Sequence, residues 1–439
     1  MSTPINIRRP LQILSLLLLL VPSMGWTGDA IVVGVPTATG FLEGKACLRA
    51  VQMAAEAINT MGGITVGTQK RPLVIEPLDI RDAAPGVPVA EALLGVEKLI
   101  LETRPAALLV GPYRSETLIA GMDLIARYKT PMLATLAMSP AFEDKIEARP
   151  DAYRYLFRTC PNARFLVDNL AGVMNLIKRT FGFKRVFILN QEVAWARSTA
   201  DALRNTYFEK AGWEIIDQRS YPTGAGDFSS TLMKVRATGA QVILPIFDMP
   251  QSGILVKQWH TMRVPALLAG FISPLAGPAS WKTFNGQISG AINCNVELGS
   301  AIASPTMPAS AAFQKAYQRR WEKPLRAGHG PAPAYESVCI LADAITRAGT
   351  LDADAIVAAL EQTDRSGMMG RMRFNDRHQL VYGRTPDTTA VAAVFQWQAD
   401  GRRRIVFPPR IAEGKIELPA GLVPVNGYRR PAPITVKGT

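Results

Sequence analysis

The sequence contains few histidines. Only His260, His329 and His378 occur in 439 residues, and none lies near another in the chain. A histidine metal site or a Ser-His-Asp triad needs several such groups close together, so the sequence offers little material for either. No nucleophile–base pair is apparent. We therefore expect a protein that is not an enzyme and holds neither a metal nor a cofactor.

Cysteine is also scarce. The four cysteines are far apart and lack the spacing of a metal-binding motif: Cys47, Cys160, Cys294 and Cys339. Each lies in an apolar stretch, which favours buried free thiols, although an oxidising compartment would permit disulfides and both states stay open. No cysteine precedes Cys47, so the usual acceptor for a lipid anchor after a leader is missing.

Residues 1–25 have the features of a secretory signal peptide. Arg8 and Arg9 precede an apolar run at residues 16–21, and the small residues Ser23 and Gly25 follow it. The run is short for a bilayer span, although an uncleaved membrane anchor is the alternative. We predict cleavage near Gly25 and a soluble exported protein.

Acidic residues are fewer than basic ones, 36 against 49, and the formal net charge is +13. The basic residues are scattered apart from clusters at 402–404 and 429–430, and no aromatic residues alternate with these clusters. We therefore expect no nucleic-acid partner. The basic balance fits either an anionic membrane surface or a weak attraction to anions.

Short apolar strands alternate with amphipathic helices along the rest of the chain. The alternation is interrupted once, at residues 159–161, and then resumes. Such a pattern predicts an α/β protein of two doubly wound lobes with parallel sheets. The strands are expected at 31–35, 73–78, 106–110, 132–134, 184–190, 214–219, 241–247, 266–270 and 391–398, and later helices at 311–321, 334–348 and 352–362.

Several stretches, weak when taken singly, occur in a familiar order. They are AAEAINTMGGI at 54–64, VGPYRS at 110–115, TPMLA at 130–134, YLFRTCP at 155–161, KAGWEII at 210–216, YPTGAGDFSSTLMKVRATGAQVI at 221–243 and VFQWQADG at 394–401. The chain resembles the type 1 periplasmic solute-binding proteins of ABC transporters for branched-chain amino acids. The resemblance implies a monomer in the periplasm that traps a small solute between two lobes and presents it to membrane permease subunits.

The resemblance also implies three chain crossings between the lobes, near residues 156–161, 271–277 and 370–385. We therefore expect the first lobe at 26–157 and 274–372, and the second at 158–273 and 373–418. An irregular tail is expected at 419–439.

Three positions in the resemblance concern an amino-acid solute. Ser115 matches the serine that holds the solute carboxylate in amino-acid-binding members. Met138, after Ala137, stands where those members have a threonine, and Ile272 stands where a glutamate usually meets the ammonium. An ammonium enclosed without an acceptor costs several kcal/mol. We therefore predict a solute with one polar or anionic end, gripped by Ser115 and backbone N–H groups.

Aromatic side chains are expected to hold the body of the solute. The resemblance assigns Trp195 and Phe247 to opposite walls, with Asp248 beside the second, and Phe41 near Glu43 in the first loop. The alternatives are a helix N-cap for Ser115, packing within its own lobe for Trp195, core for Phe247 and solvated loops for the rest. An amino-acid binder in which Asp248 or Glu43 replaces the missing acceptor stays open, as does a solute sensor of the same fold.

Overall fold

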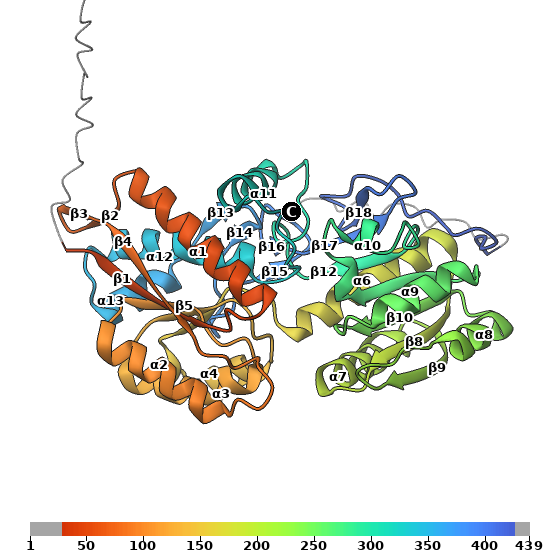
Figure 1. Ribbon diagram of the computed structural model, residues 1–439, viewed down its shortest axis with the longest axis horizontal. Helices are drawn as coiled ribbons and strands as arrows, with labels where there is room; N and C mark the ends of the chain where they lie inside the picture. The colour runs from red at the N-terminus through yellow and green to blue at the C-terminus, as the bar shows by residue number, and fades with distance from the viewer. Residues whose placement is uncertain (1–28, 426–439) are drawn as a thin grey trace, which may run out of the picture.

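The computed structural model describes residues 29–425. The predicted signal peptide at residues 1–25 and residues 426–439 of the predicted tail lie outside this range. Residues 419–425 contain neither helix nor strand. Within the described range, two lobes stand side by side and chain segments pass between them (Figure 1).

The first lobe is built on a parallel five-stranded sheet. In spatial order the strands are β4 (Leu73–Asp79), β1 (Ile31–Thr37), β5 (Ala107–Val110), β6 (Met132–Ala134) and β7 (Leu156–Arg158). Strands β1, β5 and β6 are almost entirely buried, which explains their unbroken apolar sequences. A hairpin of β2 (Ile64–Val66) and β3 (Gln69–Arg71) lies outside this sheet.

Helices cover both faces of that sheet. In Figure 1, α1 (Leu42–Thr60) and α12 (Pro331–Ala348) lie on one side, and α2 (Val89–Thr103) and α3 (Ser115–Tyr128) on the other. The remaining helices of this lobe are α4 (Ala141–Ala148), α5 (Pro150–Tyr153), α11 (Pro308–Trp321) and α13 (Ala353–Glu361). The apolar faces of these helices and the sheet form one continuous core.

The second lobe has a seven-stranded sheet. Its order is β18 (Arg403–Phe407), β17 (Ala393–Trp397), β12 (Ile292–Asn295), β11 (Leu267–Ile272), β10 (Val242–Phe247), β8 (Arg185–Gln191) and β9 (Glu214–Tyr221). Strands β8 to β12 pair in parallel, and β17 and β18 add an antiparallel edge. Its helices are α6 (Ala163–Phe181), α7 (Ala194–Leu203), η1 (Arg204–Phe208), α8 (Ser229–Thr238), α9 (Ser252–Thr261), η2 (Ser273–Leu275) and α10 (Ser280–Thr283). The predicted α/β class with two parallel-sheet lobes is confirmed.

Two of the crossings lie later in the chain than the sequence suggested. After β11 the chain stays in the second lobe, because β12 pairs with β11 and buries Ile292 and Cys294 in that core. The second crossing therefore follows residue 295, not residues 271–277. With two asparagines in four residues, β12 shows no apolar run, so the sequence pattern missed it.

The first lobe also continues beyond residue 372. A four-stranded sheet is formed by β13 (Arg365–Gly367), β14 (Gly370–Met372), β16 (Ala390–Val391) and β15 (Tyr382–Gly383). Met369, Met372 and Leu380 of this region bury their side chains in the core of the first lobe. The third crossing therefore lies between β16 and β17, at residues 391–393.

A buried arginine fixes the first crossing. Arg158, at the end of β7, is fully buried and donates to Glu143 Oε2 at 2.9 Å and to Gln379 Oε1 at 2.6 Å. The same guanidinium donates to the carbonyl oxygens of Ser139 at 2.7 Å and Ala137 at 3.3 Å. Arg158 therefore holds the loop after β6, the first crossing and the approach to the third crossing together.

Candidate functional site

Most of the predicted solute contacts lie in the loops, or in the first helical turns after those loops, that follow the carboxyl ends of strands. In the first lobe these loops follow β1, β5 and β6, and in the second they follow β8 and β10. Ligands of open parallel sheets bind at this edge. The candidate site is therefore built from the facing strand ends of the two lobes.

The loop after β5 has a constrained backbone. Val110 and Gly111 both have positive φ, 70° and 72°. The left-handed backbone at Gly111 favours glycine, and a Cβ there would also have to displace the Met132 methyl group, which would lie 2.1 Å away. A left-handed conformation is uncommon for a β-branched residue such as Val110 and often marks a functional turn. This turn presents Tyr113 and leads into α3 at Ser115.

Ser115 is the first residue of α3 and is partly exposed. Arg114 occupies the N-cap and makes no side-chain capping bond. The backbone N–H of Arg114 donates to Asp82 Oδ2 at 2.8 Å, which anchors the loop. Ser115 therefore lies at a helix start, where its hydroxyl and the first N–H groups of α3 could meet a polar group; its contact with a solute stays a prediction.

The predicted residues of the first loop lie beside this turn. Phe41 is 37% exposed, and its ring centroid lies 5.8 Å from that of Tyr113. Glu43, in the first turn of α1, is partly buried. Phe41, Glu43 and Tyr113 therefore form a joint aromatic and acidic surface on the first lobe.

Trp195 and Asp248 are brought together on the second lobe. The indole Nε1 of Trp195 donates to Asp248 Oδ2 at 3.0 Å. The Trp195 ring meets Phe271 edge-on at 5.7 Å. Gln191 Oε1 accepts from the backbone N–H groups of Asp248 and Met249, both at 3.1 Å, which holds the loop after β10. Pairing of these two loops was not evident from the sequence.

Three predicted contacts lie in the protein interior instead. Phe247 is fully buried and packs on Phe228 and Tyr221 in the second-lobe core. Phe247 therefore lies in the core of the second lobe, because the last residue of β10 directs its side chain toward the sheet face that helices cover. Ile272 is fully buried and its N–H donates to Asn293 Oδ1. Ala137 is buried, and its carbonyl binds Arg158.

Met138 connects the lobes. It follows β6 of the first lobe, yet its partly buried side chain packs on the second-lobe cluster that also receives Trp195 and Phe271. Its carbonyl accepts from Ala163 N–H at the start of α6, at 3.0 Å. Where a threonine was expected, the chain therefore has an apolar side chain that contacts the opposite lobe.

A buried charged pair near the site was missed by sequence reasoning. Glu297, after β12, is fully buried and accepts from His329 Nδ1 at 3.0 Å, Ser300 Oγ at 2.7 Å and Gly330 N–H at 2.5 Å. His329 Nε2 lies 2.7 Å from the Leu136 carbonyl. A doubly protonated imidazolium satisfies both contacts, because it donates from each ring nitrogen.

The surroundings of His329 agree with that charge. Burial alone would lower its pKa, but the Glu297 carboxylate, the Leu136 carbonyl and the Glu43 carboxylate outweigh burial, so the pKa is raised above its ordinary value. The sequence signal was a histidine between two glycines just before a proline-started helix, Gly328-His329-Gly330-Pro331. That signal is too weak to reveal a partner 32 residues away.

Charges from both lobes act on Tyr113. Burial, then the carboxylates of Glu43 and Asp248, raise the pKa of its phenol, so the hydroxyl stays protonated. Asp82 acts in the same direction, and Arg114 opposes them. Glu43 belongs to the first lobe and Asp248 to the second, so carboxylates of both lobes contribute to the raised pKa of the Tyr113 phenol.

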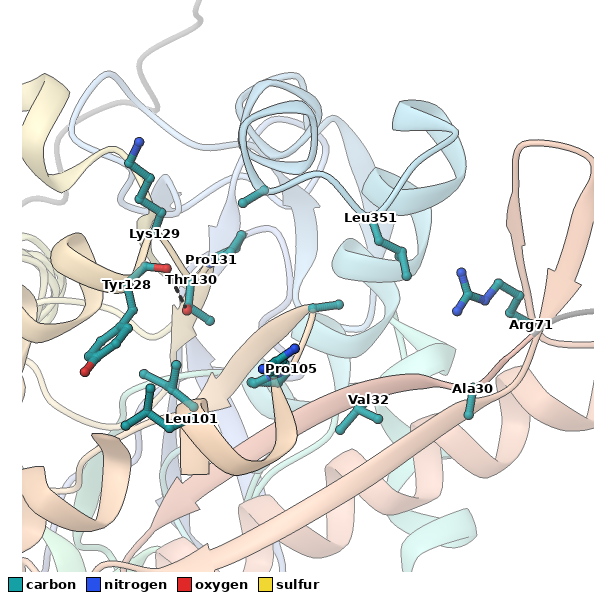
Figure 2. Close-up of a pocket in the computed structure, with 14 residues that line it drawn as sticks. Ala30, Val32, Arg71, Leu101, Pro105, Tyr128, Lys129, Thr130, Pro131 and Leu351 are labelled. Atoms are coloured by element: carbon teal, nitrogen blue, oxygen red, sulfur yellow. Dashed lines mark hydrogen bonds between the residues drawn. The ribbon is translucent and has the colours of Figure 1, made fainter. Parts of the chain in front are cut away.

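A cavity of about 520 Å³ lies elsewhere, where strands of the first-lobe sheet begin (Figure 2). Its lining includes Val32 and Ala106 near strand starts and the basic residues Arg71, Arg104 and Lys129. Figure 2 shows Arg71 and Lys129 on opposite sides of the cavity. None of the predicted solute contacts lines it. Because open sheets bind ligands at their carboxyl edge, this cavity is not the candidate site.

Comparison with known protein families identifies the family of this chain. The sequence profile of the periplasmic binding proteins matches residues 36–402. The chain belongs to this family. Family membership confirms the resemblance noted from the sequence and makes this periplasmic binding protein a solute-binding receptor of ABC transport.

Relatives of this binding protein differ in the solutes for which they are named. The Leu/Ile/Val-binding protein BraC3 of Rhizobium johnstonii is 25% identical over 352 residues, covering 79% of this chain and 85% of the relative. A putative branched-chain amino acid ABC transporter from Silicibacter pomeroyi superimposes with a TM-score of 0.76 at 19% identity, covering 89% of this chain and 100% of that one. A solute binding protein from R. palustris in complex with benzoate has a TM-score of 0.64 at 15% identity, with 86% and 95% coverage. The shared type 1 fold therefore leaves the solute open.

Two further features concern the described range only. Between residues 29 and 425, no helix combines the length and the apolar character that a membrane crossing requires. Over the same residues, histidine, cysteine, aspartate and glutamate side chains form no group of three that could hold a metal ion.

Proposed function

We propose that this binding protein captures a small organic solute between its two lobes in the periplasm and, as a monomer, delivers it to ABC permease subunits of the inner membrane. The observation that supports the proposal is that both lobes carry polar and aromatic side chains just after the carboxyl ends of their strands, Ser115 and Tyr113 on the first lobe and the bonded pair Trp195 and Asp248 on the second. A solute placed there touches both lobes at once. Such a solute stabilises the closed form over the open form.

The required energy is modest. Shifting a two-state balance from mostly open to mostly closed needs about 5.5 kcal/mol of differential binding. Charged hydrogen bonds contribute about 1.5–3 kcal/mol each, so two of them and a ring contact with Trp195 supply that amount. Ser115 offers one further polar contact, and Phe41 a second ring.

Small-angle scattering of the mature protein tests closure. We expect the radius of gyration to fall when a solute found by thermal-shift screening is added to saturation, because the lobes move together. Trp195→Ala should weaken that solute's affinity at least tenfold. Trp281→Ala, on the far side of the second lobe where Trp281 stacks on Trp397, is the matched control and should leave the affinity unchanged. Unchanged dimensions at saturation would contradict the proposal.

The charges that act on Tyr113 bear on the choice between the two solutes considered from the sequence, one with a polar or anionic end and an amino acid whose ammonium meets Asp248 or Glu43. An anionic end beside Glu43 and Asp248 meets like charges, and Arg114 is the single cation among the groups that act on the phenol. These charges favour the amino-acid binder in which the ammonium site has moved. In that arrangement Ser115 and the start of α3 hold a carboxylate, and Glu43 and Asp248 replace the acceptor missing at Ile272.

A further inference from the structure

A second cavity lies between α11 of the first lobe and strands β17 and β18 of the second. It has a volume of about 530 Å³, within the range of sites that take small organic molecules. Ala311 and Gln314 of α11 line it from the first lobe, and Trp397 and Arg403 line it from the second. The cavity shares no residue with the predicted solute contacts, so it is a separate feature of the fold.

Arg403 brings a cation to this cavity without a counter-charge. Its Nη1 donates to the carbonyl oxygens of Ala276 and Ala301, both at 2.7 Å. Within residues 29–425, no carboxylate forms an ion pair with the guanidinium, and Nε and Nη2 make no hydrogen bond. Burial alone lowers the pKa of Arg403 to about 10. Because desolvation of a cation is costly when no partner offsets it, an anion in this cavity would be favoured.

Neighbouring contacts hold the guanidinium in place. Its Cζ lies 5.5 Å from the ring centroid of Phe395 and 5.7 Å from that of Trp397. Since the two carbonyl bonds fix the Nη1 side, the edge that carries Nε and Nη2 keeps a defined orientation. This edge presents parallel N–H groups, which match two oxygens of a carboxylate or a phosphate. An arginine oriented in advance loses little freedom when it binds such an anion.

The other charged residues of the lining already have partners. Arg402 Nε pairs with Asp400 Oδ2 at 2.6 Å, and both side chains are well exposed. Glu413 Oε2 accepts from the backbone N–H of Ile405 at 2.8 Å. The lining thus carries two basic residues and one acidic residue, and Arg403 is the one whose charge is unpaired in the described range.

Apolar side chains form much of the remaining lining. They include Ile302, Pro305, Ala311 and Trp397. The indole Nε1 of Trp397 donates to the Leu275 carbonyl oxygen at 3.1 Å, so its polar group is satisfied within the protein. The cavity therefore offers apolar surface to the body of a ligand, which gains free energy when it leaves water.

We infer that this cavity binds a small organic oxyanion, a carboxylate or a phosphate ester with an apolar body, whose oxygens accept from Nε and Nη2 of Arg403. The site is distinct from the solute cleft of the proposed function, and the inference does not depend on that function. Because α11 belongs to the first lobe and β18 to the second, the anion lies where the two lobes adjoin.

Matched compounds test the charge of the ligand. Phenylacetate, benzyl phosphate and phenylacetamide share a benzyl group, and hexanoate, pentyl phosphate and hexanamide share a pentyl chain. We expect at least one carboxylate or phosphate ester to bind the mature protein in calorimetry. Its matched amide should bind at least tenfold more weakly, because the amide carries no charge for the guanidinium. Amides that bind as tightly as the anions, or no binding by any anion, overturn the inference.

Variants on both sides of the cavity locate the anion. Arg403→Gln keeps a donor for the carbonyl oxygens but removes the charge, and should weaken binding of the best anion about tenfold to a hundredfold. Arg404→Gln, at the next position of β18, removes a charge that pairs with Glu417 and should leave the affinity unchanged. Ala311→Phe fills the cavity from α11 and should also weaken binding at least tenfold. Ala309→Phe, at an exposed position of the same helix outside the lining, is its control.

The inference requires both Arg403→Gln and Ala311→Phe to weaken binding while their controls do not. An affinity that either variant leaves unchanged overturns it. If Arg403→Gln fails to fold, Ala311→Phe decides alone, because it leaves the guanidinium and its carbonyl bonds in place. Trp195→Ala separates this site from the solute cleft and should not change the affinity for the anion. A loss of affinity in Trp195→Ala would place the anion in the cleft and overturn the inference.

Discussion

Replacement of Arg158 by methionine should destabilise the folded protein strongly. The guanidinium is fully buried, and four oxygen acceptors surround it: Glu143 Oε2, Gln379 Oε1, and the Ala137 and Ser139 carbonyl oxygens. Methionine fills much of the same volume and contacts the Phe142 ring that now lies under the guanidinium. It leaves the Glu143 carboxylate buried, with only Asn162 as a donor.

The magnitude follows from the burial of both partners. The side chain of Arg158 is 0% exposed and that of Glu143 5% exposed. Removing one member of a buried pair costs about 3–5 kcal/mol, because the other charge is left unpaired in the interior. We therefore expect the free energy of unfolding to fall by about 3–5 kcal/mol.

Urea unfolding of the solute-free mature protein measures this loss. Arg164 pairs with Asp144 at 2.7 Å, but both side chains are about half exposed, so Arg164→Met should cost less than about 1 kcal/mol. If Arg158→Met fails to fold, Arg158→Lys, which keeps a charge but loses the planar fork, provides the measurement and should still cost more than Arg164→Met. A loss from the Arg158 variants no larger than that of the control would refute the reasoning.

Three other outcomes are expected. Phe247→Ala should lower the free energy of unfolding by about 3–5 kcal/mol in calorimetry, because a core ring is lost, and should change solute affinity less than Trp195→Ala does. Because the pKa of His329 is raised in the folded protein, protonation of His329 stabilises the fold. This contribution to the free energy of unfolding is fully present below the unfolded pKa of about 6.5 and is lost as the pH rises through the folded pKa. His329→Asn should flatten this pH dependence in unfolding curves taken from pH 5 to 9. Burial raises the pKa of the Cys160, Cys294 and Cys339 thiols to about 12 and that of Cys47 well above its ordinary value, so a disulfide-exchange reagent should label four thiols in denaturant and almost none in the native protein.

Strand and helix positions were predictable wherever the apolar pattern was strong. The run at residues 106–110 became β5, and the periodic helices at 311–321 and 334–348 became α11 and α12. The exceptions were segments whose burial depends on distant partners. β12 carries two asparagines and pairs with β11 and β17, while the strands of the four-stranded sheet have two or three residues each. No local pattern reports such pairing.

The candidate site shows the same division. The positions of Ser115 and Trp195, each in the first turn of a helix that follows a strand, could be inferred from the chain order, since parallel strands bring the segments that follow them to one edge. Phe247 differs from Asp248 by one residue, and that one step along an extended chain decides between core and surface. The sequence could not show which of the two side chains points into the core, because that depends on which face of the sheet α8 and α9 cover.

The sequence by itself determined the class of the protein: alternation of strands and helices, and motifs spread in a shared order, specify two α/β lobes and a family of solute receptors. Only the tertiary structure decided which charges meet. Glu43, Asp248 and the Glu297–His329 pair come from segments far apart in the chain, and each carries an ordinary local sequence. Their electrostatic character arises from desolvation and mutual distance, which exist only once the chain has folded.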